Sequence, residues 1–477
     1  MWLILVFVVI FLICLYLETQ RISLNNRFKN ISGPKQIPVF GSPYSIRVNE
    51  TSEFKEVFEE LFIDKVVKLI FGGKLLLLVS DPVVLSQVLP SKAFLDRPYP
   101  FDYFEFPTAM LSAKYPLWRP LRKQTNVCFN LRAISSMYPV LNKYANRLLT
   151  DLEPHIDGPT FDINQLTLRM GGAQVMENLM GISGEEFVID PFAFDKMEDI
   201  IMGRMFNPLY QLWPIYRLSD WYKSKKIANE TIHKFFGKII DVKGTPAETS
   251  NGAKIFIDEM LRFENNGKKL YGKDLSETVG LMYLAAFETS ALTVSYACLM
   301  MALHPEYDAK LAQEIQENYH ENEEIDSEML KKFPYLDMVV KETLRHFPSV
   351  PLTARQCMED CQVDPLGVIP KGTILVFNFW KLHRWPEFWG PDAKKFNPDN
   401  FLPENVAARH PYAHLPFSSG PRNCVGMNYA LASIKVGLIK VLAKYRFTSK
   451  LKLEEFQFKA SITLKLVGGH QVQVHRR

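Results

Sequence analysis

The chain has 477 residues, of which 47% are hydrophobic and 13% aromatic, so it can bury a large core and is not a disordered protein. Its formal net charge is only +4 and it has no long basic run, which gives no indication of nucleic-acid binding. The 6 cysteines show no framework spacing, and one lies in an apolar N-terminal run. The cysteine pattern therefore does not indicate a domain stabilised by disulfide bonds. It indicates that the protein occupies a reducing compartment.

The N-terminus is an unbroken apolar run from Trp2 to Leu17, followed by Glu18 and then by basic residues such as Arg21. A membrane-spanning helix usually needs about 17–25 apolar residues, whereas the apolar part of a cleaved signal peptide is usually about 7–15 residues long. No basic residue precedes the run and no small-residue cleavage site follows it, so a signal peptide is the less favoured alternative. We expect residues 1–20 to be a single-span anchor with the basic flank in the cytosol.

Residues 21–45 are expected to form a basic, proline-rich linker. Pro34 and Pro38 stiffen this segment and are expected to prevent the anchor helix from continuing. No repeat or low-complexity tract follows. Residues 46–477 are therefore expected to form one large domain.

Helical periodicity dominates the middle of the chain and is interrupted near Gly244. Residues 75–79 form an apolar run that is typical of a buried strand. Near the C-terminus, apolar residues alternate over 462–466 and 472–474, on either side of the Gly-Gly pair 468–469, which predicts a β-hairpin. The expected fold class is mainly α with small β-sheets, preceded by one N-terminal transmembrane helix.

Two pairs of residues each share a helix face. Trp118 and Arg122 are both hydrogen-bond donors suited to a buried carboxylate, although such a pair alone more often packs on a surface. Glu342 and Arg345 form a Glu-x-x-Arg pair, which in isolation is usually solvated and contributes little. Only their context makes these pairs informative.

A third feature is the acid–threonine pair Glu288 and Thr289, which lies in the apolar helix segment Leu284–Ser290. A carboxylate in an apolar helix costs free energy unless it has a partner or a function. The threonine hydroxyl can bond back to its own helix and loosen a turn. A solvent-facing pair is the alternative, and the flanking apolar residues argue against it.

The most informative segment is the loop Phe417–Gly426, which precedes a helical pattern. Cys424 lies just before that helix, where unpaired N–H groups are expected to lower the pKa of its thiol and favour metal ligation. Gly420 and Gly426 leave room for a flat cofactor, and Arg422 supplies a cation for an acidic group on it. A buried structural cysteine is the alternative, but five fixed positions in so short a window disfavour it.

This loop resembles the haem-binding signature of the cytochromes P450, Phe-x-x-Gly-x-Arg-x-Cys-x-Gly, and matches it at every fixed position. The resemblance continues in order along essentially the whole chain, through both helix-face pairs, the acid–threonine pair and the string Phe396–Phe401. It implies a cytochrome P450 fold in which residues 46–477 are the haem-binding catalytic domain. In that fold Cys424 is the axial thiolate of the iron of haem b.

The resemblance also implies roles for the other candidate residues. Those expected to contact the haem or its propionates are Trp118, Arg122, Arg355, Phe417, Gly420, Arg422 and Gly426. Glu342 and Arg345 are expected to be a buried structural pair. Glu288 and Thr289 are expected to be catalytic, because the family uses an acid–threonine pair to deliver protons during oxygen activation.

Besides the minor departure at Leu121, three positions depart from the usual family pattern. Ala286 replaces a frequent glycine and is expected to narrow the groove for oxygen. Ala285 stands where many family-four fatty-acid hydroxylases carry a glutamate esterified to haem, so we expect non-covalent haem. Asn400 replaces a frequent arginine, and this asparagine, together with the string Arg409–Phe417, resembles the microsomal family-four clan.

The resemblance implies a monooxygenase that uses NADPH indirectly, through NADPH–cytochrome P450 reductase, with cytochrome b5 as a further candidate partner. Arg119, Lys123 and Lys435 are candidate basic contacts for the reductase, although a solvated basic face is the alternative. The anchor implies the endoplasmic reticulum membrane, with the catalytic domain in the cytosol. No nucleic-acid partner is expected.

The implied substrate is a hydrophobic small molecule: a fatty acid, a steroid-like molecule or a foreign compound. Aromatic residues in segments 101–106 and 205–216 fit an apolar substrate entrance near a membrane, and core packing is an equal alternative for 205–216. Two other functions remain open. One is a haem-thiolate isomerase or dehydratase acting on lipid hydroperoxides, against which the retained acid–threonine pair argues. The other is a catalytically silent haem or lipid binder, against which the intact loop argues.

Overall fold

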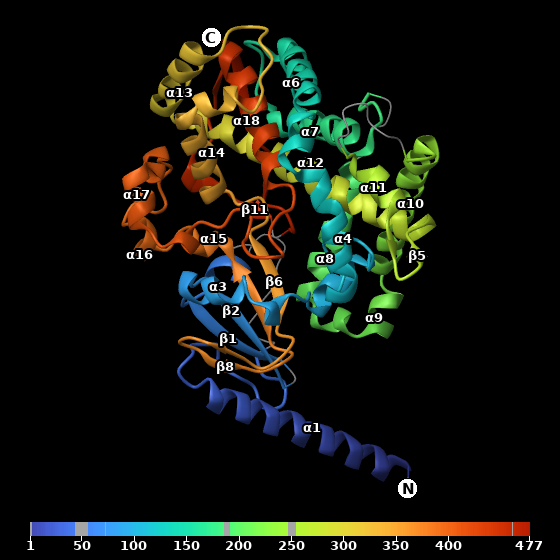
Figure 1. Ribbon diagram of the computed structural model, residues 1–477. Coiled ribbons are helices and arrows are strands. Elements are labelled where there is room, and N and C mark those ends of the chain that lie inside the picture. Colours follow the sequence, from blue (N-terminus) through green and yellow to red (C-terminus); the bar gives the residue numbers. More distant parts are fainter. Residues whose placement is uncertain (1, 43–55, 72, 186–190, 247–253, 460) are drawn as a thin grey trace.

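The structure is a computed structural model that describes residues 2–42, 56–71, 73–185, 191–246, 254–459 and 461–477 (Figure 1). Helices make up most of the molecule, and the expected fold class is confirmed. The α-helices are α1 (Trp2–Arg27), α3 (Pro82–Val88), α4 (Tyr115–Asn126), α5 (Leu131–Ser135), α6 (Tyr138–Leu152), α7 (Ile163–Met180), α8 (Pro191–Phe206), α9 (Trp213–Leu218), α10 (Asp220–Lys243), α11 (Phe256–Arg262), α12 (Gly272–Leu303), α13 (Pro305–Asn318), α14 (Pro334–His346), α15 (Phe379–Leu382), α16 (Pro386–Trp389), α17 (Pro403–Ala408) and α18 (Met427–Lys444).

The strands are short and form several small sheets. They are β1 (Val66–Phe71), β2 (Lys74–Val79), β3 (Phe161–Asp162), β4 (Glu264–Asn265), β5 (Lys268–Lys269), β6 (Leu352–Gln356), β7 (Cys361–Val363), β8 (Gly367–Ile369), β9 (Ile374–Asn378), β10 (Tyr445–Thr448), β11 (Phe458–Lys459), β12 (Lys465–Leu466) and β13 (Gln471–Arg476). The largest sheet has the order β1-β2-β9-β6 and joins strands from both halves of the chain. The strand expected at 75–79 is β2. In β6, Arg355 pairs with Leu375 of β9, so this sheet positions one candidate cofactor-binding residue.

The long helix α12 forms the centre of the molecule (Figure 1). It is apolar enough to pass as a membrane span, with a mean hydropathy of 1.3, but 83% of its most apolar window is buried within the protein. It packs against α7, α10 and α18. A helix that is apolar on all sides is stable only when other elements surround it, which explains its central place.

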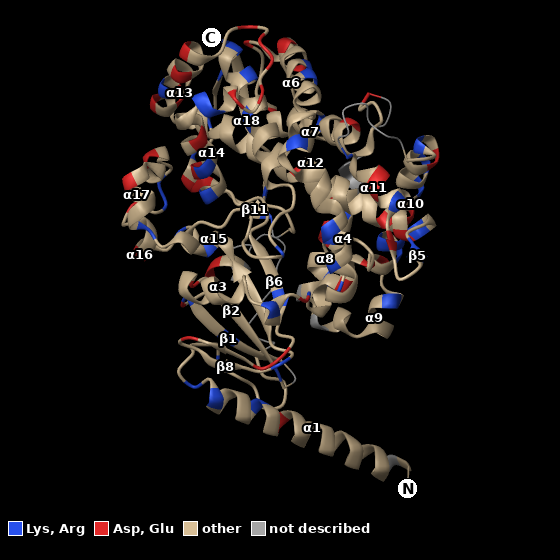
Figure 2. Cartoon of the chain, viewed as in Figure 1, with Lys and Arg blue, Asp and Glu red and all other residues tan. Residues whose placement is uncertain are grey.

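Helix α1 is exposed and apolar. Its segment Ile4–Arg27 has a mean hydropathy of 2.0, none of its most apolar window is buried, and it is a candidate membrane anchor. Figure 2 shows that its charged residues lie only in its C-terminal part. The helix continues past residue 20 to Arg27, because no glycine or proline occurs before Gly33 to end it. The expected linker therefore begins as helix, and its expected end at residue 45 lies outside the described residues.

The prediction of a C-terminal β-hairpin around the Gly-Gly pair is wrong. β12 pairs with β11, whereas β13 pairs with β10 and β3. Gly468 and Gly469 both have positive φ (83° and 76°), and a Cβ at Gly469 would collide with the Asp162 carboxylate. Gly469 is needed because the chain passes β3 closely there, whereas a Cβ at Gly468 would meet nothing within 4 Å among the described residues. The chain is redirected at this pair and does not fold back into a hairpin. The interruption expected near Gly244 is confirmed, since α10 ends at Lys243.

The aromatic segment 205–216 is divided between core and surface. Tyr216 is buried, but around α9 large apolar side chains are exposed: Leu209, Leu212, Trp213, Ile215, Leu218 and Trp221. We call these six residues the α9 patch. α9 lies toward the end of the molecule that carries α1 (Figure 1). An exposed apolar patch of this kind marks a surface for membrane or partner contact.

Candidate functional site

The loop before α18 folds back on itself through backbone hydrogen bonds. The Cys424 N–H donates to the Phe417 carbonyl (2.9 Å), and the Asn423 N–H donates to the Gly420 carbonyl (3.1 Å). Gly426 caps the N-terminus of α18. Cys424 therefore lies just ahead of the helix, as the sequence predicts.

The two glycines of this loop have different roles. Gly420 has φ +73°, and a Cβ there would collide with the carbonyl oxygen of Leu89, so the protein's own backbone requires glycine. A Cβ at Gly426 would meet only the ring edge of Phe129, at 3.7 Å, which is an ordinary contact. Of the two glycines, only Gly426 therefore leaves space beside the loop that is not filled by neighbouring protein atoms.

The Cys424 thiol is exposed, yet surrounding protein atoms are dense enough to raise its pKa. Burial is the largest effect. The Gly426 N–H and the positive charge of Arg122 act in the opposite direction and lower it. The expected pKa-lowering influence of the helix start is therefore present, but burial outweighs it, so the expectation of a lowered Cys424 pKa is wrong.

Helix α4 is joined to the cysteine loop by Trp118 and Arg122. The Arg122 guanidinium donates to the Asn423 carbonyl (2.6 Å) and to the Asn423 side-chain oxygen (2.7 Å). The buried Trp118 ring lies 4.3 Å from the guanidinium carbon of Arg422. Both predicted residues of α4 thus contact the loop that contains Cys424.

Three buried arginines come together at this loop: Arg422 of the loop itself, Arg355 of β6, and Arg97. Each is at most 5% exposed, and none forms an ion pair within the described part of the chain. Their hydrogen bonds go mainly to backbone carbonyls, for example from Arg355 to Arg422 (3.1 Å) and from Arg422 to Ala113 (2.8 Å). Burial lowers the pKa of Arg355 and of Arg422 to about 9.

Sequence reasoning missed Arg97. It donates to the Thr353 hydroxyl (3.0 Å) and to the Ala354 carbonyl (2.9 Å), beside Arg355. Burial, and then the charges of Arg355 and Arg422, lower its pKa well below its ordinary value. In the sequence it is a single arginine before a proline, and only the fold brings it to the other two.

The Glu342–Arg345 pair is fully buried in α14, as expected. Its two hydrogen bonds are both 2.7 Å long, and Arg345 also donates to the carbonyls of His383 (2.9 Å) and Ala393 (2.6 Å). Burial raises the pKa of Glu342, but Arg345 outweighs it and lowers the value to about 2. The pair therefore connects α14 to the segment after β9.

Asn400 does not leave this pair isolated. Its side-chain amide donates to Glu342 (3.2 Å). Arg409 donates to the Asn400 carbonyl (2.8 Å), and its guanidinium carbon lies 3.7 Å from the Trp389 ring centre. Arg345 also lies against Trp389, at 4.8 Å. A second cation thus approaches the network from a position nine residues after the asparagine.

Glu288 and Thr289 face different sides of α12, because successive residues of a helix are rotated by about 100°. The Glu288 carboxyl is buried and accepts from the Thr463 hydroxyl (2.9 Å). Thr289 is half-buried, and its hydroxyl donates to the Ala285 carbonyl (2.9 Å). Ala285 is exposed and Ala286 half-buried, so these alanines and Thr289 form an accessible face on an otherwise buried stretch of helix.

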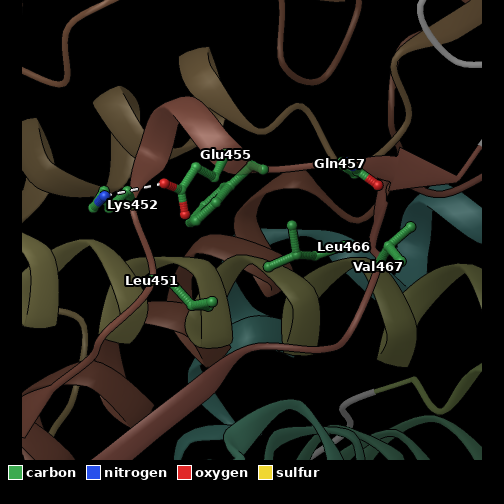
Figure 3. Close-up of a pocket in the computed structure, with 7 residues that line it drawn as sticks. Leu451, Lys452, Glu455, Gln457, Leu466 and Val467 are labelled. Carbon is green, nitrogen blue, oxygen red and sulfur yellow. Dashed lines mark hydrogen bonds and ion pairs between the residues drawn. The ribbon is translucent and has the colours of Figure 1, made fainter.

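A surface cavity of about 100 Å³ lies beside β12 (Figure 3). Its lining includes Leu451, Phe456 and Leu466, with the Lys452–Glu455 ion pair (3.1 Å) at its edge. None of the candidate site residues lines it. This cavity is therefore separate from the cysteine loop.

The chain matches the family model described as Cytochrome P450 over residues 31–470, so it belongs to the cytochrome P450 family. It is 28% identical to "Probable cytochrome P450 313a4" of Drosophila melanogaster, with 98% of each chain covered. It is 28% identical to "Cytochrome P450 4c21" of Blattella germanica, covering 95% of this chain and 94% of the relative. It is 28% identical to "Cytochrome P450 4V2" of Mus musculus, covering 92% and 88%. The expected resemblance to family four is confirmed, and the protein is a monooxygenase of this family, which holds haem through a cysteine thiolate.

The residues present fit that cofactor. Arg97, Arg355 and Arg422 are buried cations without an acid partner in the described residues, an arrangement that is costly unless an anion binds. Haem brings two carboxylates. Within the same residues no group of three or more His, Cys, Asp or Glu side chains could hold a metal ion. The exposed Cys424 thiol is instead suited to be a single protein ligand to a metal already held by a cofactor.

Proposed function

We propose that the protein is an NADPH- and reductase-dependent monooxygenase that hydroxylates a hydrophobic small molecule. The observation that carries the proposal is the loop Phe417–Gly426. It presents the exposed Cys424 beside three buried arginines that have no acid partner among the described residues. Membership of the cytochrome P450 family supports the chemistry.

In this proposal Cys424 is the iron ligand. Haem ligated by a thiolate supplies the oxygen-activation chemistry when it is bound. The haem propionates would be held by the side-chain donors of Trp118, Arg122, Arg97, Arg355 and Arg422. Phe417 and Gly420 maintain the shape of the loop, and Gly426 leaves its surface free for the ring plane.

The accessible face of α12 is proposed to belong to the active site. There Ala285 and Ala286 offer no polar group, and the Thr289 hydroxyl is the group that holds and passes a proton. Glu288, on the buried side of the same turn, is the acid that replenishes it. Exclusion of bulk water by the packed residues around α12 favours this controlled proton transfer.

The proposed reductase surface is on α4. Arg119 and Lys123 lie on one face of this helix, both are exposed, and neither forms an ion pair among the described residues. Lys435 is less suited, because it is paired with Asp337 at 2.6 Å. Unpaired basic side chains can attract an acidic partner, with a rate that falls as salt is added. Cytochrome b5 is a second candidate for this surface.

We propose location in the endoplasmic reticulum membrane, with α1 as the anchor and the remainder in the cytosol. The α9 patch supports the proposal, since its exposed Trp213, Trp221 and aliphatic side chains suit a membrane surface. An apolar substrate dissolved in that membrane would reach the protein directly. The substrate class is accordingly a fatty acid, a steroid-like molecule or a foreign compound.

For Thr289→Ala we expect haem binding to survive and NADPH oxidation to be diverted into peroxide. The ratio of product to NADPH consumed should fall about tenfold or more, because positioned proton transfer contributes about 10²–10⁴-fold to rates. Thr231→Ala is a matched control, since that hydroxyl also bonds the carbonyl four residues back, at 2.9 Å, but on the exposed face of α10. Unchanged coupling in Thr289→Ala would remove this residue from the proton path.

The haem is expected to be non-covalent. Ala285 has no carboxylate that could be esterified, although it is exposed on the proposed cofactor side of α12. Acid–organic extraction of the haem-loaded protein should therefore transfer the haem to the organic phase. Haem that stays on the polypeptide would contradict this expectation.

The function is tested by reconstituting the purified protein with its reductase and a panel of lipids. Product formation that requires NADPH is the expected result. Turnover of lipid hydroperoxides without NADPH would instead indicate an isomerase or dehydratase. Haem binding with neither activity across the panel would indicate a silent binder.

A further inference from the structure

The Glu288 carboxyl is held from outside its own helix. The Thr463 hydroxyl donates to Glu288 Oε1 (2.9 Å), and the Lys465 ammonium lies 3.2 Å from the same atom. Both partners come from the C-terminal segment at β12, whereas Glu288 belongs to the central helix α12. The orientation of this acid therefore depends on distant parts of the chain.

A second buried carboxylate, Glu198 of α8, shares both partners. Its Oε2 atom accepts from the Thr463 hydroxyl (3.1 Å) and lies 2.9 Å from Lys465 Nζ. It also accepts from the Ser461 hydroxyl (2.8 Å). Glu198 is 1% exposed and Glu288 is 5% exposed. We call Glu198, Glu288, Thr463 and Lys465 the acid cluster.

The acid cluster extends from solvent to the core. Lys465 Nζ lies 2.6 Å from Asp195 Oδ1, and the Asp195 side chain is 52% exposed. At the opposite end, Glu288 Oε2 is buried and has no hydrogen-bond partner among the described residues. A buried polar atom of this kind usually binds an ordered water. The free oxygen belongs to the helix turn that carries Thr289.

Charges of both signs act on Glu288. Burial, and then the negative charge of Glu198, raise the pKa of Glu288 to about 8, and Lys465 opposes them. Asp195 adds a smaller upward effect, and the Thr463 hydroxyl a downward one. Among the described residues, the charged groups that act on Glu288 are therefore two acids from α8, Glu198 and Asp195, and one base from β12, Lys465. At neutral pH the acid cluster holds a proton whose affinity depends on the balance between Glu198 and Lys465.

We propose that the acid cluster is the solvent-side half of the proton route to Thr289, and that Glu198 and Lys465 control when Glu288 releases and regains its proton. The proposal rests on the proposed monooxygenase function of the acid–threonine pair. Glu198 and Lys465 are positioning residues in it, because they act through Glu288. Nothing in the local sequence around Glu288 indicates them.

The protons balance as follows. Glu288 gives its proton from the free Oε2 atom, through water, toward Thr289. The Thr463 hydroxyl then gives its proton to Glu288 Oε1 and takes one, through water, from solvent at the Asp195 end, so one proton enters for each that leaves. Glu198 and Lys465 carry no proton along this route and act on the proton affinity of Glu288 through their charges.

The test uses two variants that change the local charge in opposite directions. Glu198→Gln removes a negative charge, so Glu288 should ionise at lower pH; Lys465→Gln removes a positive charge, so Glu288 should ionise at higher pH. Each shift is expected to be about 1–3 pH units, the usual effect of a charge within about 4–6 Å. Infrared pH-difference spectra of the purified, haem-loaded protein measure it, with the carboxyl band assigned by its loss in Glu288→Gln.

Lys459→Gln is the matched control. Lys459 joins the same two elements, β11–β12 and α8, through Asp199 (2.6 Å), without a contact to Glu288. The Lys459→Gln variant should leave the pH at which Glu288 ionises unchanged. Infrared shifts of the same sign in Glu198→Gln and Lys465→Gln, or no shifts, would overturn the control of Glu288 by the acid cluster.

The second readout is the pH profile of coupling, measured as product formed per NADPH. It should move down in pH for Glu198→Gln and up for Lys465→Gln, whereas general damage to the fold would not move it in opposite directions. Opposite infrared shifts with an unmoved profile overturn the role in proton delivery. If the unaltered protein shows no NADPH-dependent turnover, the proposed function has failed, and the infrared result alone decides on the acid cluster.

Discussion

Cys424→Ala is expected to abolish the thiolate spectrum of the carbon monoxide-bound, reduced protein and all NADPH-dependent turnover. Alanine has no ligand atom, and the described residues contain no group of His, Cys, Asp or Glu that could hold a metal ion in its place. The fold should persist, because the loop is closed by backbone hydrogen bonds such as that from the Cys424 N–H to Phe417, which alanine also makes.

Cys361→Ala is the control, since this free cysteine is only partly buried and lies in the small sheet β7–β8, outside the loop. It should keep the thiolate spectrum. The ligand assignment is wrong if Cys424→Ala keeps that spectrum, or if Cys361→Ala loses it.

Glu342→Ala is expected to yield little haem-loaded protein. Removing one partner of a buried ion pair leaves an uncompensated charge, which typically costs about 3–5 kcal/mol. Arg345 would keep its carbonyl acceptors at His383 and Ala393 but lose both bonds to the carboxylate. Because α14 leads directly to β6 and Arg355, the loss is expected to reach the cofactor site. Denaturant unfolding and the haem content of the purified protein measure the effect.

Glu328→Ala tests whether burial is the reason. Glu328 and Lys331 form an ion pair at the same sequence spacing (2.8 Å), but both side chains are at least 70% exposed. An exposed pair contributes little, so this variant should match the unaltered protein in haem content and unfolding midpoint. Equal losses in the two variants would mean that the buried Glu342 pair has no special structural role.

The sequence predicted the site residues best where the residues that act together lie within one short segment. The loop Phe417–Gly426 and the pair Glu342–Arg345 are such segments, and the structure places them as a helix-start loop and a buried pair. The strand at 75–79 and the end of α10 near Gly244 follow from apolar runs and glycine placement in the same way.

Long-range packing explains what the sequence did not indicate. Arg97 is brought to Arg355 and Arg422 only by the fold, and Glu288 finds Lys465 across 177 positions of chain. The glycines 468–469 satisfy a hairpin pattern, but Gly469 lies against the Asp162 carboxylate of β3, and the chain forms no hairpin there. Each case depends on a contact between segments far apart in sequence, which neither periodicity nor motif spacing encodes.

The proposed function is tested most directly with isotopically labelled dioxygen. The protein is reconstituted with its reductase, NADPH and a lipid that it converts to product, and the label in the product is measured. We expect one labelled oxygen atom in each product molecule, with none when NADPH is omitted. Product that forms without NADPH and carries oxygen only from a lipid hydroperoxide would contradict it.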